Sequence, residues 1–324
     1  MKITRGMIDK ELRFTGRVHD LLTGMIFSTE NRIRRSHRRA QESKDKPTLP
    51  AGMICEEVFA ERADGTPLRL CVFRSAKTAA NATGVLWIHG GGYAAGSPEQ
   101  HAVHCESMLS AANCVIVAPD YTLSPEKPYP AALEDCYSAL VWMKEHADGL
   151  GVNTDQLFVT GVSAGGGLTA AVTLYARDQG DVNIAFQMPL YPMIDCDMKR
   201  PSAVDNNAPI WNSKRNALAW RLYLGELYGT PDVPKYASPM KETDYAGLPP
   251  AYTFIGDLDP FYDETLAYFE NLKEAGVPAE VDVYQGCYHA FEMLVPQAEV
   301  SRRAQRGMIE AFVYAVGNYF APQV

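Results

Sequence analysis

The middle of the sequence reads Leu157-Phe158-Val159-Thr160-Gly161-Val162-Ser163-Ala164-Gly165-Gly166-Gly167. Residues 157–160 are apolar or β-branched and are typical of a buried strand, whereas residues 164–177 are typical of a helix. A G-x-S-x-G pattern lies between them, on a sharp strand-to-helix turn. We therefore predict an α/β fold in which this turn presents Ser163.

The tight turn explains the residues around Ser163. It strains the backbone of the serine, and glycines two residues to either side remove the side chains that would collide there. The hydroxyl is left at the top of the sheet, beside a helix N-terminus that favours developing negative charge. A bare G-x-S-x-G arises by chance in about one chain in ten of this length. The position between strand and helix therefore carries the prediction that Ser163 is a nucleophile.

Short apolar runs separated by helical stretches continue in both directions from this turn. They predict strands at residues 85–88, 115–118, 157–160, 185–190, 252–255 and 280–284. This alternation is the signature of a parallel sheet covered by helices on both faces. Two earlier β-rich runs, 55–59 and 68–73, flank the Asp64-Gly65 turn and predict an antiparallel pair. The predicted fold class is α/β, with a mostly parallel, doubly wound sheet.

Four segments are expected along the chain. They are an N-terminal helical segment at 1–50, a first core part at 51–194, a helical insertion at 195–236 and a second core part at 237–324. Apolar residues between Ile3 and Ile26 recur at mostly helical spacing and predict an amphipathic helix. Lys44 to Gly52, with two prolines, reads as a linker. Residues 195–236 show no strand pattern and carry aromatic residues at partly helical spacing.

The charge of the chain limits its partners. A net charge of −9 over 324 residues disfavours general attraction to nucleic acid or to anionic lipid. The distribution is uneven, because residues 1–46 hold 12 Lys or Arg against 6 Asp or Glu, and five arginines fall between Arg32 and Arg39. We interpret that run as a solvated helix face rather than a nucleic-acid or membrane patch. A neutral small molecule is the expected ligand.

Cysteine use and the N-terminus indicate the cytoplasm. The seven cysteines include no C-x-x-C pair, and because their number is odd they cannot all pair internally. Charged residues between Arg5 and Arg13 interrupt any apolar run, so neither a signal peptide nor a membrane span is expected. We expect a cytoplasmic protein that does not associate with a membrane.

A second glycine-rich motif, His89-Gly90-Gly91-Gly92-Tyr93, follows the apolar run at 85–88. Acyl transfer creates an oxyanion, and backbone N–H groups aimed at that oxyanion need a loop with little side-chain bulk. The amides of Gly91 and Gly92 are expected to serve as donors, with the amide of Ala164 as a third. The motif therefore predicts an oxyanion hole beside Ser163.

The alternative for this motif is a dinucleotide-binding loop. Gly90-x-Gly92-x-x-Ala95 matches a relaxed form of that fingerprint, in which the glycines open a helix and cradle a pyrophosphate. Here the next helix is expected only at Ser97-Pro98, a cap residue followed by proline in the first turn. The glycines do not open that helix, so the dinucleotide interpretation is disfavoured.

A general base is expected in the loop after the last predicted strand, where this architecture gathers its chemistry. His289 lies there and completes the chain order serine, acid, histidine. The other six histidines lie in the N-terminal segment, on presumed helices or in the glycine loop, and we interpret them as structural. Three aspartates, Asp257, Asp259 and Asp263, follow the strand at 252–255. Each is a candidate for the acid that orients the imidazole, and each could instead cap the next helix.

Taken together, these motifs resemble the hormone-sensitive-lipase family of esterases, a branch of the α/β hydrolases. The resemblance extends from about Asn81 to the C-terminus and rests on spaced stretches at 89–92, 120–126, 130–135, 161–166, 259–264 and 289. In this family the aspartate before proline belongs to the triad, which implies Asp259. The family also implies that residues 1–50 and 195–236 cap the serine, and that the protein forms a homodimer through a sheet edge.

The motifs and the resemblance predict a serine carboxylesterase that hydrolyses short- to medium-chain acyl esters through an acyl-enzyme on Ser163. No cofactor or metal is expected. Trp211, Trp220 and Tyr223 are candidates to line the acyl pocket, and core packing explains them equally well. The alternatives are an amidase or peptidase with the same triad, and a non-catalytic receptor on a hydrolase scaffold. A receptor would normally lack a triad member, and none is missing.

Overall fold

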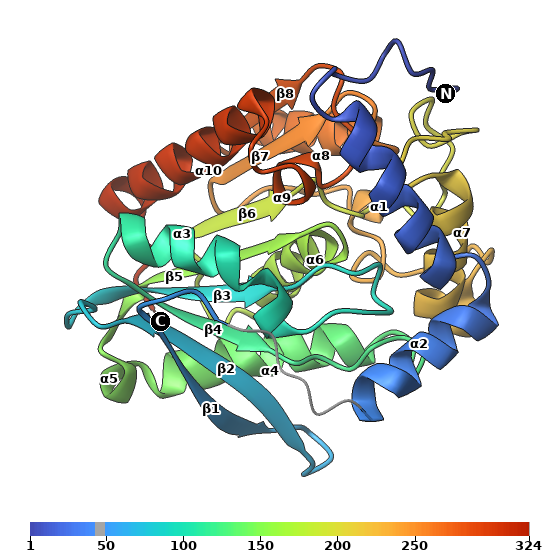
Figure 1. The fold of residues 1–324 in the computed structure, drawn as a ribbon. Coiled ribbons are helices and arrows are strands. Elements are labelled where there is room, and N and C mark those ends of the chain that lie inside the picture. Colours follow the sequence, from blue (N-terminus) through green and yellow to red (C-terminus); the bar gives the residue numbers. More distant parts are fainter. Residues whose placement is uncertain (43–48, 324) are drawn as a thin grey trace.

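One eight-stranded sheet forms the centre of the computed structural model, which describes residues 1–42 and 49–323. Its strands lie in the order β1-β2-β4-β3-β5-β6-β7-β8 (Figure 1). Their bounds are β1 (Met53–Glu61), β2 (Pro67–Ser75), β3 (Ala82–Ile88), β4 (Cys114–Pro119), β5 (Val152–Val162), β6 (Phe186–Leu190), β7 (Ala251–Gly256) and β8 (Ala279–Tyr284). β2 runs antiparallel to β1 and to β4, and the remaining neighbours are parallel. The predicted fold class is confirmed, and every predicted strand is present with bounds that differ by a few residues.

The central strands are buried on both faces, which explains their continuous apolar runs. Every residue of β3, β4, β6 and β7 is buried, whereas the edge strand β1 is largely exposed. Strands covered on both sides lose the alternation of polar and apolar residues that a half-exposed strand keeps. Because β3 to β8 are parallel, the loops that follow them gather at one side of the sheet.

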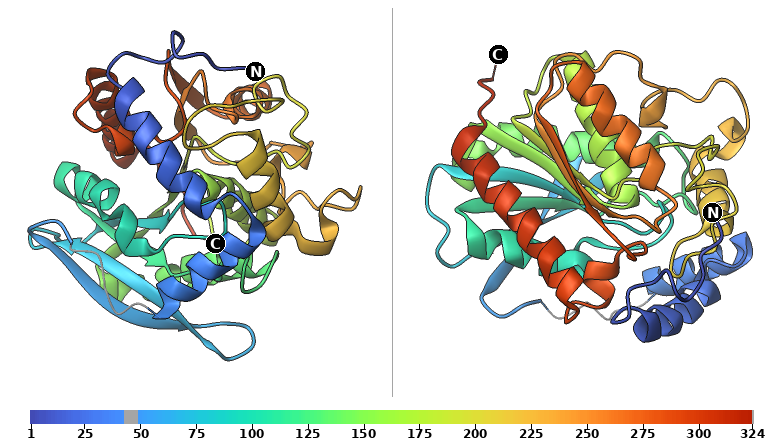
Figure 2. Two further views of the ribbon diagram at one scale, coloured as in Figure 1. Left: turned by 45° about the vertical axis from the view of Figure 1, so that its right-hand side comes forward. Right: turned by 90° about the horizontal axis from the view of Figure 1, so that it is seen from above.

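Helices cover both faces of the sheet in the part of the chain that the structure describes. Their bounds are α1 (Arg13–Ile26), α2 (Glu30–Glu42), α3 (Ala102–Ala111), α4 (Ala131–Glu145), α5 (Ala147–Leu150), α6 (Ala164–Gln179), α7 (Ser213–Leu224), α8 (Tyr262–Glu274), α9 (Phe291–Leu294) and α10 (Glu299–Asn318), with short 3-10 turns η1 (Pro98–His101), η2 (Gly225–Leu227) and η3 (Pro239–Lys241). α3 and α10 lie on one face, and α4, α6 and α8 lie on the other (Figures 1 and 2). Among the described residues, no helix is both long enough and apolar enough to cross a bilayer.

The N-terminal prediction is wrong for its first half. The helix expected from Ile3 begins only at Arg13, and residues 1–12 form turns and irregular backbone. The amide of Ile3 donates to Asn207 Oδ1 at 2.5 Å, and the amide of Asp9 donates to Gly286 O at 2.9 Å. These amides therefore bond to distant loops instead of forming a helical ladder. Residues 44–48 of the predicted linker lie outside the described residues.

The insertion at 195–236 is less helical than predicted. Only α7 and the short turn η2 are helical, and the remainder is irregular. Side-chain hydrogen bonds hold the irregular part, since Asn206 Nδ2 donates to Ser202 O at 2.9 Å and to Leu258 O at 3.2 Å. α7 itself begins at a capped end, where the Asn212 side chain accepts from the amide of Arg215. Together with α1 and α2, α7 lies on the side to which the parallel strands point (Figure 1).

Candidate active site

Ser163 occupies the turn between β5 and α6 with a strained backbone. Its φ is 58° and its ψ is −118°, a backbone conformation that residues other than glycine rarely adopt. A Cβ at Gly161 would lie 2.5 Å from Ile88 O, and a Cβ at Gly165 would lie 2.1 Å from the same oxygen. The structure therefore explains both glycines of the G-x-S-x-G pattern, because any larger residue would collide with the end of β3.

Three side chains form a continuous hydrogen-bonded chain at this turn. His289 Nε2 lies 2.8 Å from Ser163 Oγ, and His289 Nδ1 lies 2.7 Å from Asp259 Oδ2. All three residues are buried, with exposed fractions of 7% for the serine, 4% for the histidine and 1% for the aspartate. An Nδ1–H that donates to the carboxylate leaves Nε2 free to accept the serine proton. The geometry is that of a nucleophile, a base and an orienting acid.

The structure separates the three candidate aspartates. Asp259 contacts His289, and its second oxygen accepts from the amide of Phe261 at 2.9 Å. Asp257 instead accepts from the amide of Gly286 at 2.7 Å, and burial raises the pKa of its carboxyl. Asp263 accepts from the amide of Ser202 at 2.7 Å. The outer two aspartates therefore hold loops, and only the middle one reaches the imidazole.

The glycine loop after β3 presents free amides next to Ser163. Within the described part of the chain, the amides of Gly91, Gly92 and Ala164 donate no hydrogen bond. Gly91 has a φ of 124°, and a Cβ there would lie 1.9 Å from Ala95 O, so only glycine fits. Ala164 is the first residue of α6, where the helix dipole adds positive potential. The three predicted donors are thus available for an oxyanion.

The next helical turn begins with η1 at Pro98, after the N-cap residue Ser97, and α3 follows at Ala102. The glycines of the loop end several residues earlier and do not open a helix, as the sequence predicted. A dinucleotide phosphate would need the helix N-terminus directly after the glycines. This geometry does not support the dinucleotide alternative.

Tyr93 and the residues around it hold the glycine loop in place. Its hydroxyl donates to Met193 O at 2.8 Å, and its carbonyl accepts from both the amide and the hydroxyl of Ser124 at 2.7 and 2.6 Å. The Tyr121 hydroxyl donates to His89 O at 3.0 Å, and the two rings stack with centroids 4.2 Å apart. Burial lowers the pKa of His89, which keeps its ring neutral. His89 therefore has a structural position, as expected.

Of the three aromatic residues proposed for the acyl pocket, the structure brings only Trp211 to the triad. Its ring centroid lies 6.1 Å from that of His289, and a Cβ at Gly92 would lie 2.5 Å from its ring. Trp220 and Tyr223 instead pack on Tyr93, with centroid distances of 5.6 and 3.8 Å. Those two residues pack against the glycine loop through Tyr93, so their contacts agree with core packing rather than with a role in the acyl pocket.

Two residues that the sequence analysis did not single out lie behind the base. The ring of Tyr191 meets the ring of His289 edge-on, with centroids 5.1 Å apart. Its hydroxyl donates to Glu292 Oε1 at 2.6 Å, and His104 Nε2 lies 3.5 Å from the same oxygen. Burial raises the pKa of Tyr191 well above its usual range, so this hydroxyl stays protonated and remains a donor. No sequence signal marks Tyr191, because its role depends on a carboxylate a hundred residues away.

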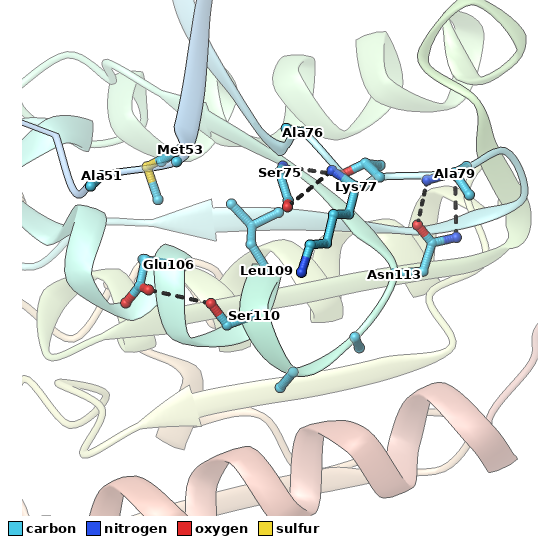
Figure 3. A pocket seen from close by; sticks show the side chains of 14 residues that line it. Ala51, Met53, Ser75, Ala76, Lys77, Ala79, Glu106, Leu109, Ser110 and Asn113 are labelled. Carbon is cyan, nitrogen blue, oxygen red and sulfur yellow. Dashed lines mark hydrogen bonds between the residues drawn. The ribbon is translucent and has the colours of Figure 1, made fainter.

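The structure also has a surface hollow of about 690 Å³, whose lining side chains are drawn in Figure 3. It is lined by residues 51–53, 75–79 and 109–113 and by Glu106, which include the start of β1, the end of β2, the end of α3 and the residue before β4. These segments lie at the amino ends of the parallel strands, whereas Ser163 follows the carboxyl end of β5. The hollow is therefore separate from the triad. Within residues 1–42 and 49–323, no three His, Cys, Asp or Glu side chains are grouped as metal ligands.

Comparisons with known proteins agree with this geometry. A model of the alpha/beta hydrolase fold family matches residues 85–293. Esterase LipI of Mycobacterium tuberculosis is 38% identical over 213 residues, which cover 65% of this chain and 66% of LipI. Carboxylesterase NlhH of the same organism is 30% identical over 280 residues, which cover 85% of this chain and 88% of NlhH. A solved bacterial heroin esterase has a TM-score of 0.85 at 31% identity, over 97% of this chain and 99% of that one.

Proposed function

The chain is a carboxylic ester hydrolase of the alpha/beta hydrolase fold family, in its hormone-sensitive-lipase-like branch, and we propose that it works through an acyl-enzyme on Ser163. One observation carries this proposal: the unbroken chain of hydrogen bonds from Asp259 through His289 to Ser163. Such a chain activates a hydroxyl that is otherwise a weak nucleophile near neutral pH.

The first half of the reaction forms the acyl-enzyme. His289 Nε2 takes the proton of Ser163 while the serine oxygen attacks the ester carbonyl. The amides of Gly91, Gly92 and Ala164 hold the resulting oxyanion, and removal of one such donor costs about 10² to 10³ in rate in comparable sites. When the tetrahedral intermediate collapses, the alcohol leaves with the proton from His289. Asp259 keeps the imidazole in the correct tautomer and stabilises the transient imidazolium.

The second half releases the acid. His289 takes a proton from water, the hydroxide oxygen attacks the acyl carbon, and the same amides hold the second oxyanion. The proton then returns to Ser163 as the carboxylic acid leaves. Because the alcohol departs before water reacts, the kinetics are expected to be ping-pong.

The proposed substrates are neutral esters of short- to medium-chain acids. Trp211 packs against both Gly92 and the ring of His289, so an apolar wall limits the space next to the reacting carbonyl. Phe27 meets Trp211 edge-on with centroids 5.2 Å apart, which links the N-terminal segment to that wall. These contacts support a cap made from residues 195–236 and from the described part of residues 1–50, as the family resemblance implied. A neutral acyl group fits an apolar lining of this kind.

We also propose a homodimer that pairs through the free side of β8, the strand at one edge of the sheet. β8 pairs with β7 in the described sheet, and its outer side leaves backbone groups open to a second strand. Light scattering on the purified protein tests this proposal.

The decisive experiment compares the wild type with Ser163→Ala on chromogenic esters from acetate to octanoate. We expect turnover of the shorter esters and loss of at least about 10³-fold in the variant. Ser110→Ala, at an exposed serine on α3, is the matched control and should keep wild-type activity. Matched amides are included to separate ester from amide cleavage. A folded wild type that turns over none of the esters would contradict the proposal.

A further inference from the structure

Helix α1 turns its apolar face outward, whereas an ordinary amphipathic surface helix turns that face toward the core. Its inward face is small and polar: a Cβ at Gly16 would lie 2.6 Å from Tyr288 Oη, and one at Gly24 would lie 2.9 Å from Arg215 Nη2. Asp20 Oδ1 accepts from Arg215 Nη1 at 2.6 Å on the same face. A surface helix usually turns its apolar stripe toward the core. Here, close glycine packing and an ion pair hold the helix in place instead.

The apolar residues of α1 point into water. Five large side chains recur at the spacing i, i+4, i+7, i+8 and i+11, which places them on one face of the helix. Their exposed fractions are 79% for Phe14, 45% for Val18, 70% for Leu21, 53% for Leu22 and 61% for Met25. Single exposed apolar residues are ordinary, but a continuous stripe of this kind marks an interaction surface. We refer to these five residues as the α1 stripe.

Helix α2 places positive charge beside the α1 stripe. Five arginines on it are exposed, namely Arg32, Arg34, Arg35, Arg38 and Arg39. Figure 2 shows α1 and α2 next to each other along one side of the molecule. Residues 1–42 hold 10 Lys or Arg against 5 Asp or Glu, whereas the whole chain has a net charge of −9. The apolar stripe and the only strongly basic part of the sequence are therefore neighbours.

We propose that α1 and α2 form a docking surface for an anionic lipid–water interface. An exposed apolar stripe with adjacent arginines is the chemistry by which a helix lies in the plane of such an interface. The apolar side chains enter the acyl boundary, and the arginines pair with anionic headgroups. This proposal departs from the expectation of no membrane association, and it replaces the interpretation of the arginine run on α2 as a solvated helix face. A docking surface responds to local charge, because screening limits electrostatic reach to about 8–10 Å.

Charge argues against a second copy of the chain as the occupant of this surface. Two copies that met through their α1 stripes would bring two segments of net +5 face to face. Like charges across an interface suppress pairing, whereas an anionic lipid surface complements them. The homodimer proposed through β8 uses a different part of the molecule.

The docking surface lies on the side of the molecule that carries the triad. α1, α2 and α7 lie where the parallel strands end, and Phe27, just after α1, contacts Trp211 beside His289. A lipid surface bound by α1 and α2 would therefore lie next to the proposed cap over Ser163. The proposal goes beyond the proposed function, and lipid binding does not require the serine to be catalytic.

Vesicle flotation with the 324-residue chain tests the proposal. Wild type is mixed with vesicles of phosphatidylcholine alone, and with vesicles that contain about 30% phosphatidylglycerol to supply an anionic surface, at low and high salt. We expect binding to the anionic vesicles, with a loss of about tenfold when salt screens the arginines. The double variant Phe14→Glu/Leu21→Glu should lose binding, and Arg35→Glu should weaken it by about fivefold or more.

Phe59→Glu is the matched control, because Phe59 on β1 is also exposed, at 61%, but lies outside the α1 stripe. It should bind vesicles like the wild type. Hydrolysis of a water-soluble acetate ester is measured on every variant. This assay tests the proposed catalysis at Ser163 separately from the proposed binding to lipid. The proposal is overturned if wild type ignores anionic vesicles, or if the double variant binds them normally. A wild-type dimer that the double variant dissociates, without vesicle binding, would assign the stripe to a second copy instead.

Discussion

At the scale of single residues, the direction of each aspartate side chain in the loop after β7 decides its role, because the residue type is the same at all three positions. Asp257, Asp259 and Asp263 carry the same carboxylate within one loop and the first turn of the next helix. Two of them accept from backbone amides at 2.7 Å and thereby fix the approach of neighbouring segments. The third ends 2.7 Å from an imidazole nitrogen. The chemistry of the loop is therefore set by where each Cβ points.

This difference gives a prediction. Asp259→Asn should lower kcat by about 10³ to 10⁴, because an amide favours the wrong tautomer of His289. Asp257→Asn should retain most activity, because the introduced carboxamide keeps an oxygen that can accept from the amide of Gly286. Steady-state kinetics on a short ester, with circular dichroism to confirm folding, make the comparison. Equal losses in both variants would show that Asp259 has no special role.

At the scale of the elements, α1 and the residue before it are in close contact with the loop that carries His289. Gly16 packs on the ring of Tyr288, the residue before His289, and the Tyr288 hydroxyl donates to Leu12 O at 3.1 Å. The contact has no room for a side chain, since a Cβ would lie 2.6–2.7 Å from three atoms of the Tyr288 side chain. The position of the N-terminal segment and that of the base are therefore linked by packing.

Gly16→Val should displace α1 and disturb the His289 loop. We expect kcat/KM to fall by about tenfold or more, because small shifts of a catalytic group are costly. We also expect faster proteolysis between α1 and β1. Gly149→Val in α5 is the control, since a Cβ there would meet nothing within 4 Å. If the two valine variants behave alike, α1 does not position the loop.

At the scale of the whole molecule, the core contains histidines that stay neutral. Burial lowers the pKa of His101 well below its usual 6.5, and it lowers the pKa of His89 as well. The rings of His101 and His104 lie with centroids 6.2 Å apart, and a positive charge on His104 would further oppose protonation of His101. These histidines belong to the layer under the glycine loop, so their protonation concerns the stability of the entire fold.

The sign of the pH effect follows from the direction of these shifts. A histidine with a folded pKa below its unfolded pKa takes up its proton more readily when unfolded, so stability is lost as pH falls below about 6.5. We expect the free energy of unfolding in urea to decrease from about pH 6.5 to about pH 5. His101→Phe should reduce that slope by up to about 1.4 kcal/mol per pH unit. The variant His146→Phe, at an exposed histidine, is measured in parallel as the control for loss of an imidazole. An identical slope in His101→Phe would contradict this account.

The sequence by itself determined the features that depend on local backbone and local hydrophobicity. The strands are apolar runs because both faces of the sheet are covered, so their positions could be read directly. The turn at Ser163 needs glycines at fixed offsets, and the loop at Gly91 needs a backbone that only glycine adopts, so both motifs were visible as patterns. The candidate base followed from its place after the last strand.

Only the tertiary structure decided the features that depend on segments far apart in the chain. It brought Asp259, which the family resemblance had implied, into contact with His289, and it placed Trp211 beside the same histidine. It also packed Trp220 and Tyr223 against Tyr93 of the glycine loop and brought Tyr191 to Glu292. It also turned the apolar face of α1 outward, although periodicity alone predicts that such a face is buried. The reason is physical: periodicity defines the faces of a helix, whereas the surfaces that each face meets are supplied by other parts of the chain.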